Sequence, residues 1–353
     1  MLKTRIAING FGRIGRNAFK IASERYDLEV VAINDVFDTR RLAHLLKYDS
    51  TYGIYNKKIG FDSENITVNG RKTRLFNQRN PALLPWGDLG VDIVIESSDV
   101  FTEPSKAKSH INQAGAKRVI ISAPSSSQGV STIILGVNEH QLPVSLEVIS
   151  AGSCTSNCGA LILDIINRNF GIKGAMMTAV HSYMSGQKLL DSPAKNLREA
   201  RGAAVNLIPT ATGASITITR VLPNLIGIFE AYAVRVPTSL VSLADFVITT
   251  ENKVTKDKVN KLFKKLSNDP YYQGILDTND QELVSSDYIG NSHSATVDLD
   301  LTDVLGDNLL KIVAWYDNEW AYSNRLVELA ADVGRMLAGK NYSQDAFLEE
   351  THI

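Results

Sequence analysis

Short β-branched runs alternate with amphipathic stretches through residues 1–150. The runs predict buried strands over residues 5–9, 28–34, 91–96, 117–122, 132–135 and 147–150. The stretches between them predict helices over 16–24, 39–47 and 103–114. Because strands that alternate with helices form parallel β-α-β units, we predict an α/β fold with a Rossmann-type, mostly parallel sheet. Asn69-Gly70, between the strand-like segments 66–68 and 72–76, predicts a hairpin inserted in that sheet.

The pattern changes after Gly152. It predicts a helix over 154–169, a strand over 175–181 and an irregular stretch over 182–206, and a loop of that length is usually functional. Further β-rich runs lie at 211–222, 229–236, 241–249, 295–301 and 310–316, with helices at 255–266 and 321–337. This order predicts a second, α+β domain with a mainly antiparallel sheet.

Length agrees with two domains, since 353 residues at about 150 per domain give that number. We predict a first domain over 1–152, joined by a C-terminal helix over 319–340, and a second domain over 153–318. Residues 341–353 form a mildly acidic tail that we expect to be mobile.

Charge and cysteine content narrow the function classes. The formal net charge is −1, from 37 basic and 38 acidic residues, so we expect no nucleic-acid partner. Two cysteines exclude a disulfide-rich secreted scaffold. No apolar run approaches the ~18 residues of a membrane span, and the N-terminus lacks a signal-peptide pattern, so we expect a cytoplasmic protein with no membrane partner.

A glycine-rich turn carries the first chemical signal. Gly10, Gly12 and Gly15 form a GxGxxG motif that follows the first predicted strand and opens the first helix. In that context the glycines allow a pyrophosphate to approach the helix N-terminus. Asp35 lies at the distance where a carboxylate accepts hydrogen bonds from the adenosine ribose, and it would repel a 2′-phosphate. The motif therefore predicts NAD rather than NADP. The alternative is that Asp35 only caps a turn.

The second signal is a cysteine at a strand-to-helix junction, Ser153-Cys154-Thr155-Ser156-Asn157. A sulfur at a helix N-terminus has a lowered thiol pKa, which makes Cys154 a candidate nucleophile. The alternative is a small buried cysteine, which is our interpretation of Cys158. The pair lacks a second pair of ligands at zinc-finger spacing, so we predict no metal site.

His181 is the best candidate for a base among the six histidines. It ends a predicted strand at the start of the irregular stretch, where catalytic groups commonly gather. The other histidines lie in helical patterns, polar loops or the tail, where a structural or solvated role is the default.

These residues resemble the phosphorylating glyceraldehyde-3-phosphate dehydrogenase family. The resemblance runs from Ile6 to about Leu337. The motifs that carry it are INGFGRIGR (8–16), HLLKYDS (44–50), SCTSN (153–157), HSY (181–183), RVPT (235–238) and WYDNEWAYSNR (315–325).

The resemblance implies a role for each matching position. Cys154 is the nucleophile and His181 its base. The implied cofactor contacts are Gly10, Gly12, Arg13, Ile14, Asp35, Arg79, Ser122 and Asn318, of which Asn318 binds the nicotinamide amide. The implied sites for inorganic phosphate and for the substrate's phosphate contain Ser153, Thr155, Met184, Arg198, Thr212, Gly213 and Arg235.

The implied reaction is NAD-dependent oxidation of glyceraldehyde 3-phosphate in the presence of inorganic phosphate, giving 1,3-bisphosphoglycerate. It would proceed through a Cys154 hemithioacetal and a thioester. The stretch over 182–206 resembles a loop that lines the neighbouring subunit's cofactor site, which implies a homotetramer.

The chain departs from the family around the phosphate sites. Met184 replaces a threonine, Gly186 an acid, and Glu199 an arginine of some members. With a methionine at position 184, the chain also resembles erythrose-4-phosphate dehydrogenase. In that enzyme water cleaves the thioester, and it is the first alternative. The second is a catalytically silent NAD-binding interaction protein, against which the intact Cys154, His181 and Asn318 argue.

Overall fold

The chain folds into two compact units. The computed structural model describes residues 3–125, 130–142 and 145–339, so the predicted tail lies outside the described residues. The first unit contains the residues up to Ile133, Asn138–Gly152 and the last helix from Ser323 on. The second unit contains Ile134–Val137 and Ser153–Tyr322. The chain thus passes from one unit to the other between Gly152 and Ser153, directly before the candidate nucleophile.

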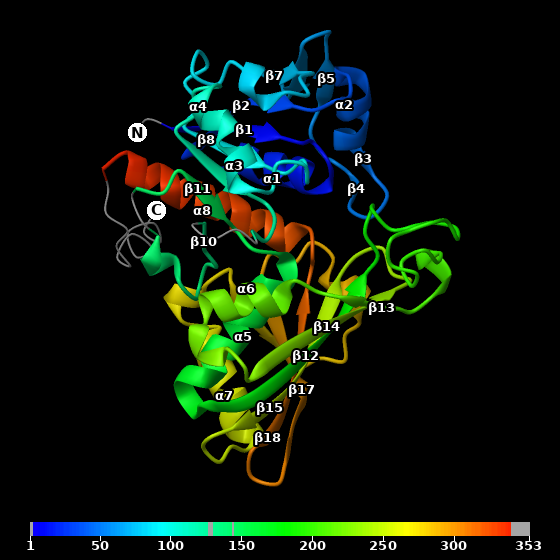
Figure 1. Cartoon of the computed structure of the whole chain (residues 1–353), viewed down its shortest axis with the longest axis vertical. Helices are drawn as coiled ribbons and strands as arrows, with labels where there is room; N and C mark the ends of the chain where they lie inside the picture. The colour runs from blue at the N-terminus through cyan, green and yellow to red at the C-terminus, as the bar shows by residue number, and fades with distance from the viewer. Residues whose placement is uncertain (1–2, 126–129, 143–144, 340–353) are drawn as a thin grey trace. The chain divides into compact units, whose positions relative to one another are not determined.

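The first unit is built on a nine-stranded sheet of order β10-β11-β9-β8-β1-β2-β7-β6-β5 (Figure 1). Its strands are β1 (Thr4–Asn9), β2 (Leu28–Asn34), β5 (Ile59–Phe61), β6 (Asn65–Val68), β7 (Arg71–Phe76), β8 (Ile93–Glu96), β9 (Arg118–Ile121), β10 (Ser131–Thr132) and β11 (Val148–Ser150). All pairs are parallel except β5–β6 and β6–β7. The Rossmann-type, mostly parallel sheet is therefore confirmed.

The antiparallel excursion is the predicted hairpin. Asn69 and Gly70 connect β6 to β7 and both have positive φ, 48° and 85°. Two residues with positive φ match the right-handed twist of the strands, which is why Asn-Gly favours this turn. The hairpin prediction is therefore confirmed.

The first unit also contains α1 (Arg13–Glu24), α2 (Thr39–Lys47), α3 (Pro104–Ala107) and α4 (Ser109–Asn112), besides the part of the last helix from Ser323 on. Helices α3 and α4 replace the single helix predicted over 103–114. A separate two-stranded ladder joins β3 (Tyr48–Asp49) to β4 (Gly53–Ile54). Trp86 is fully buried in a hydrophobic cluster that includes aliphatic side chains from β1, β2, β8 and β9.

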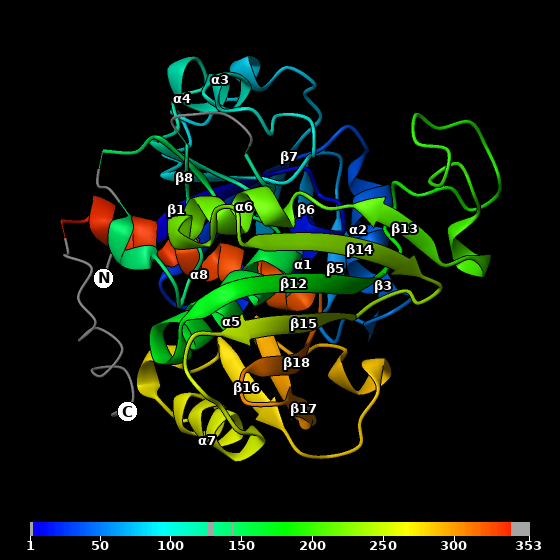
Figure 2. The ribbon, with the colours of Figure 1, turned by 60° about the horizontal axis from the view of Figure 1, so that its bottom comes forward.

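The second unit is built on a seven-stranded sheet of order β13-β14-β12-β15-β18-β17-β16 (Figure 2). Its strands are β12 (Ile172–Ser182), β13 (Ile208–Ala211), β14 (Phe229–Val236), β15 (Ser242–Thr250), β16 (Leu276–Asn279), β17 (Ala295–Leu305) and β18 (Leu309–Tyr316). Only β12–β14 and β16–β17 are parallel pairs. The mainly antiparallel sheet is therefore confirmed, and helices α5 (Cys154–Phe170), α6 (Ala214–Val221) and α7 (Lys256–Leu266) accompany it.

Helix α6 corrects the β-rich run predicted over 211–222. Its Ile and Thr residues alternate as in a strand, but Ala214, Thr217, Ile218 and Val221 are buried at helical spacing. Thr217 donates its hydroxyl hydrogen bond to the Gly213 carbonyl at 3.0 Å, four residues back. The burial of one helical face outweighs the weak strand preference of β-branched residues.

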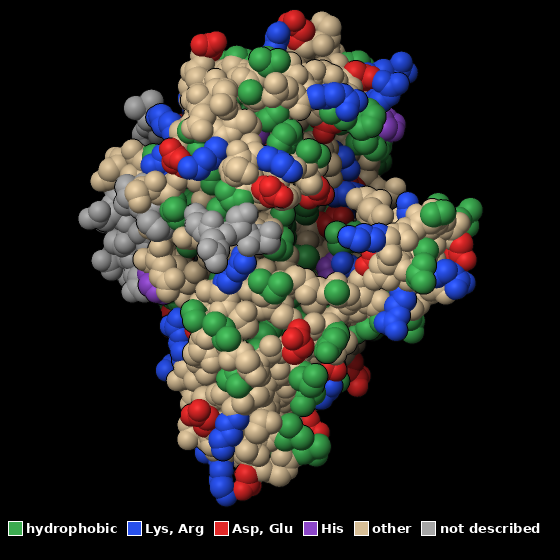
Figure 3. Space-filling model, in the orientation of Figure 1, with side chains coloured by type: hydrophobic (Ala, Val, Ile, Leu, Met, Phe, Trp, Pro, Cys, Tyr) green, Lys and Arg blue, Asp and Glu red, His purple; other side chains and the backbone are tan. Residues whose placement is uncertain are grey.

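The last helix, α8 (Trp320–Leu337), is followed by Gly339 with φ of 74°, a conformation that favours glycine after a helix. Among the described residues, no helix has the length and apolar content needed to cross a bilayer. Basic and acidic side chains are interspersed over the face shown in Figure 3.

Candidate active site

Cys154 is the first residue of α5, and a capping box fixes the start of that helix. Ser153 accepts a hydrogen bond on its Oγ from the Ser156 amide at 3.1 Å, and the Ser153 amide donates to Ser156 Oγ at 2.7 Å. These reciprocal bonds hold the residues on both sides of the sulfur. Cys154 as a whole residue is half-buried.

His181 brings its ring against this sulfur. Cys154 Sγ lies 3.5 Å from His181 Nε2, and His181 Nδ1 lies 2.7 Å from the carbonyl oxygen of Ser182. A carbonyl oxygen only accepts hydrogen bonds, so Nδ1 carries the proton. The Nε2 lone pair therefore faces the thiol and is placed to accept its proton.

The electrostatics of the pair follow from burial and from Arg235. Burial lowers the pKa of His181 to about 3, and the positive charge of Arg235 acts in the same direction. Burial raises the pKa of the Cys154 thiol, although Thr155 and the charge of Arg235 oppose this. The predicted lowering of the thiol pKa by the helix terminus is thus outweighed by desolvation. A base is therefore needed to take the proton, and neutral His181 is placed to accept it.

Cys158 lies one helical turn deeper and is fully buried. Burial raises the pKa of its thiol strongly. This agrees with its interpretation as a structural cysteine, because a buried thiol in apolar surroundings is inert.

Arg235 reaches the site through strand pairing. In the parallel pair β12–β14, Arg235 is the register partner of His181. Its Nη1 atom is buried and has no hydrogen-bond partner among the described residues. A buried guanidinium nitrogen without a partner is costly, so this atom suits an anionic ligand.

Tyr316 was not singled out by the sequence, yet it contacts His181 and Thr155, the residue after Cys154. Its hydroxyl lies 3.1 Å from Thr155 Oγ1, and its ring meets the His181 ring edge to face, with centroids 6.2 Å apart. Tyr316 ends β18, two residues before Asn318, and that position within the WYDNEW motif was the available signal.

Asn318 is oriented by two hydroxyl groups. Its Oδ1 accepts hydrogen bonds from Ser182 Oγ at 2.9 Å and from Ser242 Oγ at 3.3 Å. With the oxygen held in this way, the Nδ2 amide group is left to donate elsewhere. Asn318 therefore has the polarity that the implied contact with a nicotinamide amide requires. Ser182, missed by the sequence, connects it to His181.

In the first unit, the glycine-rich turn has the geometry that a bound dinucleotide needs. Gly10 has φ of 91°, and a Cβ there would lie 2.5 Å from the backbone of Ser98. Gly12 is the N-cap of α1, supplies no side-chain cap, and has open space where a Cβ would be. Both features fit a pyrophosphate at the helix N-terminus, with the amides of Arg13 and Ile14 in the first turn.

The remaining cofactor candidates lie at the carboxyl ends of parallel strands. Asp35 follows β2 and accepts the Phe11 amide on Oδ2 at 2.7 Å. Ser122 follows β9, and the exposed Arg79 lies beyond β7. The Arg13 guanidinium binds Asp49 and Thr51. The chain order reverses between β1 and β8, where ligands of such sheets bind.

The implied phosphate residues divide into two groups. Ser153 and Thr155 lie beside Cys154, and Thr212 and Gly213 lie just before α6, which packs on α5. Met184 and Arg198 are exposed, and within the described residues no hydrogen bond or ion pair joins either one to the Cys154–His181 pair.

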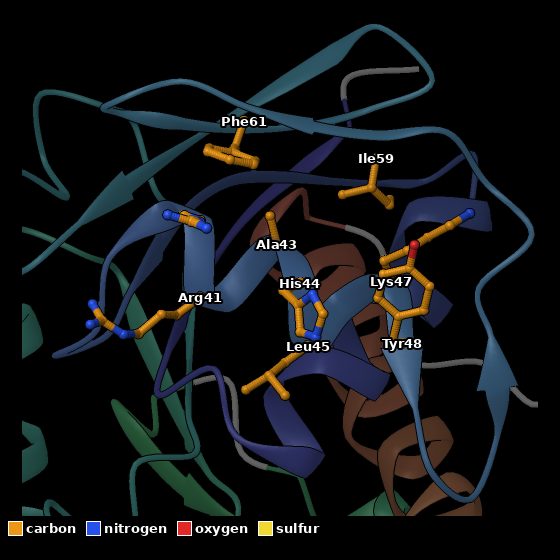
Figure 4. Close-up of a pocket in the computed structure, with 9 residues that line it drawn as sticks. Arg41, Ala43, His44, Leu45, Lys47, Tyr48, Ile59 and Phe61 are labelled. Carbon is orange, nitrogen blue, oxygen red and sulfur yellow. The ribbon is translucent and has the colours of Figure 1, made fainter.

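A pocket of about 650 Å³ lies elsewhere in the first unit, between α2 and β5 (Figure 4). His44 and Tyr48 line it with their rings 5.0 Å apart, opposite Ile59 and Phe61. It contains none of the candidate site residues.

A Rossmann-type unit together with a cysteine–histidine pair defines a class of nucleotide-dependent dehydrogenases that act through a cysteine nucleophile. Family models of glyceraldehyde 3-phosphate dehydrogenase match the chain twice, the NAD binding domain over residues 4–104 and the C-terminal domain over 153–318. The chain belongs to the glyceraldehyde-3-phosphate dehydrogenase family, which confirms the resemblance seen in its motifs.

Similar curated proteins carry the same name. The chain is 46% identical to the glyceraldehyde-3-phosphate dehydrogenase of Borreliella burgdorferi over 331 residues, 92% of this chain and 98% of that protein. It is 47% identical to the Streptomyces coelicolor protein of that name over 335 residues, 94% of this chain and 99% of the other. It is 45% identical to glyceraldehyde-3-phosphate dehydrogenase 1 of Bacillus subtilis over 335 residues, 95% and 99% of the two chains.

Proposed function

We propose that the chain is an NAD-dependent, phosphorylating glyceraldehyde-3-phosphate dehydrogenase of glycolysis and gluconeogenesis. The observation that carries this proposal is the distance of 3.5 Å from Cys154 Sγ to an unprotonated His181 Nε2. Family membership supports the substrate. Of the two alternatives, neither erythrose-4-phosphate dehydrogenase nor a silent NAD-binding protein is favoured by the comparisons.

The chemistry begins with the cysteine–histidine pair. His181 Nε2 takes the thiol proton as Cys154 Sγ bonds to the aldehyde carbon, and returning that proton to the oxygen gives a hemithioacetal. His181 then removes the hydroxyl proton while the C–H bond breaks, which leaves a thioester on Cys154. NAD, when bound, supplies the hydride acceptor. Inorganic phosphate attacks the thioester carbon, the C–S bond breaks, and an acyl phosphate leaves.

Arg235 supplies the positive charge for binding the phosphate groups. Its unpartnered buried Nη1 supports a role in holding the substrate's phosphate. The hydroxyls of Ser153, Thr155 and Thr212, with the Gly213 backbone, are proposed for inorganic phosphate. Met184 is half-exposed and has no donor, so Arg235 carries more of the binding here than it would beside a threonine.

NAD is the proposed cofactor, bound by the first unit through the glycine turn and Asp35. The Asp35 carboxylate already accepts the amides of Phe11 and Phe37 and retains lone pairs for a ribose hydroxyl. Its negative charge disfavours the 2′-phosphate of NADP.

We further propose a homotetramer. The loop over 182–206 exposes Leu189, Leu190 and Leu197 by 77%, 80% and 83%. Clustered apolar side chains with such exposure mark interaction surfaces. A Leu190→Ser variant is expected to sediment as smaller species, whereas Leu83→Ser, at an exposed leucine of the first unit, sediments unchanged. Unaltered sedimentation of Leu190→Ser would place the subunit contacts elsewhere.

A cytoplasmic location is also proposed. Both cysteines are free, and a thiol nucleophile requires a reducing compartment. Cell fractionation tests this: recovery of the enzyme outside the cytoplasmic fraction would contradict it.

One steady-state experiment tests the function. NAD reduction is measured with glyceraldehyde 3-phosphate and with erythrose 4-phosphate, each with and without inorganic phosphate. Fast reduction of the first aldehyde that depends on phosphate is the expected result. Equal rates without phosphate and a preference for erythrose 4-phosphate would establish the first alternative, and no reduction with either would establish the silent protein.

A further inference from the structure

A fully buried carboxylate lies beneath the candidate dinucleotide site. Glu96 ends β8, and its side chain has no exposed surface. Its Oε1 accepts hydrogen bonds from Ser98 N at 2.8 Å and Ser98 Oγ at 2.5 Å. Its Oε2 accepts from Asn9 Nδ2 at 2.6 Å and lies 2.9 Å from His110 Nε2. Four donors thus surround one carboxylate.

The tautomer of His110 is fixed by Trp86. The indole nitrogen of Trp86 can only donate, and it lies 2.9 Å from His110 Nδ1. Nδ1 is therefore the acceptor, and the ring proton is on Nε2, pointing at Glu96. Among the described residues, no lysine or arginine forms an ion pair with Glu96, so hydrogen bonds alone stabilise its charge.

The polar chain continues across the sheet. Asn34 Nδ2 donates to Asn9 Oδ1 at 2.7 Å, and Asn34 Oδ1 accepts the Gln78 amide at 2.9 Å. Asn9, Asn34 and Glu96 are the last residues of β1, β2 and β8, which are neighbours in the sheet (Figure 1). One connected set of buried bonds therefore fixes the carboxyl ends of three strands.

These strand ends lead directly into the candidate cofactor turns. Asn9 precedes Gly10, Asn34 precedes Asp35, and Glu96 is bonded to Ser98. Gly10 and Ser98 are in such close contact that a Cβ on Gly10 would lie 2.5 Å from Ser98 N. A shift of Ser98 therefore displaces the glycine turn.

We infer that Glu96 is a positioning residue for the dinucleotide: its carboxylate sets the relative placement of the Gly10, Asp35 and Ser98 turns. The inference rests on the proposed cofactor site. Glu96 itself has no accessible surface, so it acts through these turns and does not touch the cofactor.

The charge of Glu96 is required because all its partners are donors. In Glu96→Gln, an NH₂ group replaces one oxygen and faces the donors of Ser98, or those of Asn9 and His110. Loss of one or two charge-assisted hydrogen bonds is expected to weaken NAD binding roughly tenfold to hundredfold.

The test compares three variants of the full chain by NAD titration and steady-state kinetics. Glu96→Gln is expected to raise the KM and Kd for NAD while the KM for the aldehyde stays within about twofold. Asp35→Asn is the positive control, since it alters the proposed cofactor site itself. Asp92→Asn is the matched control: Asp92 directly precedes β8 and binds Arg5 and Lys117, at the other end of the strand.

The outcomes separate the two proposals. Normal NAD affinity in Glu96→Gln with weakened affinity in Asp35→Asn overturns the inference and leaves the cofactor site standing. Normal affinity in both overturns the cofactor site as well. Equal weakening in Glu96→Gln and Asp92→Asn shows a general structural role and overturns the inference. If Glu96→Gln does not fold, Ser98→Ala decides, because it keeps the carboxylate and removes only the bond from Ser98 Oγ to Glu96 and the bond that Ser98 Oγ accepts from the Val100 amide. Unchanged affinity there also overturns the inference.

Discussion

Replacing His181 by asparagine removes the proposed base and changes little else. Asparagine retains an N–H group that can donate to the Ser182 carbonyl, which now accepts from Nδ1 at 2.7 Å. It offers no lone pair that takes a proton at neutral pH. The change therefore isolates proton transfer from the packing of the site.

The magnitude follows from the protonation state. With a pKa of about 3, His181 is neutral in all but about one molecule in 10⁴ at pH 7, so the full base is present. A positioned base contributes about 10²–10⁴ in rate, which corresponds to roughly 3–5 kcal/mol of barrier. We expect kcat of His181→Asn to fall by about that factor.

The assay is NAD reduction with saturating aldehyde and phosphate, with circular dichroism as the control for folding. The rate of Cys154 alkylation by iodoacetamide at pH 7 is measured alongside. It should fall at least about tenfold, because the raised thiol pKa leaves the sulfur dependent on its neighbour. A folded His181→Asn variant with kcat within tenfold of the parent would refute the assignment of His181 as the base.

Three further predictions concern other residues. Cys154→Ala is expected to abolish activity, whereas Cys158→Ala is expected to retain it. Alkylation followed by peptide mapping should label Cys154 before Cys158, and equal labelling of both cysteines would contradict this. Asp35→Asn is expected to raise kcat/KM for NADP relative to NAD by about tenfold, the effect of ~1.4 kcal/mol, and an unchanged ratio would exclude Asp35 as the discriminating residue. Burial raises the pKa of Asp332 to about 7, so the contribution of its protonated form to stability is present at low pH and is lost as pH rises through 7. The Tm of the parent protein should therefore fall more from pH 6 to pH 8 than the Tm of Asp332→Asn. Parallel Tm curves of the two proteins would count against this.

Sequence alone determined the elements whose signals are local. The hairpin at Asn69-Gly70 requires positive φ at two adjacent residues, and Thr255 caps α7 through the Lys258 amide. Both are contacts within a few residues of the chain, so residue type is sufficient. The same holds for the capping box that starts α5 at Cys154.

The run over 211–222 shows where local signals fail. Its β-branched alternation favours a strand, but α6 buries one helical face in the second unit. Propensity differences amount to less than about 1 kcal/mol per residue, so the burial of that face decides the structure.

Only the tertiary structure decided the electrostatics of the site. Cys154 and His181 are far apart in sequence, and the parallel pairing of β12 with β14 makes Arg235 the register partner of His181. The sequence predicted a lowered thiol pKa from the helix terminus, but burial reverses the direction. Residue types and their local spacing determine which groups are present, whereas desolvation and charge proximity depend on contacts between distant segments, which only the folded chain establishes.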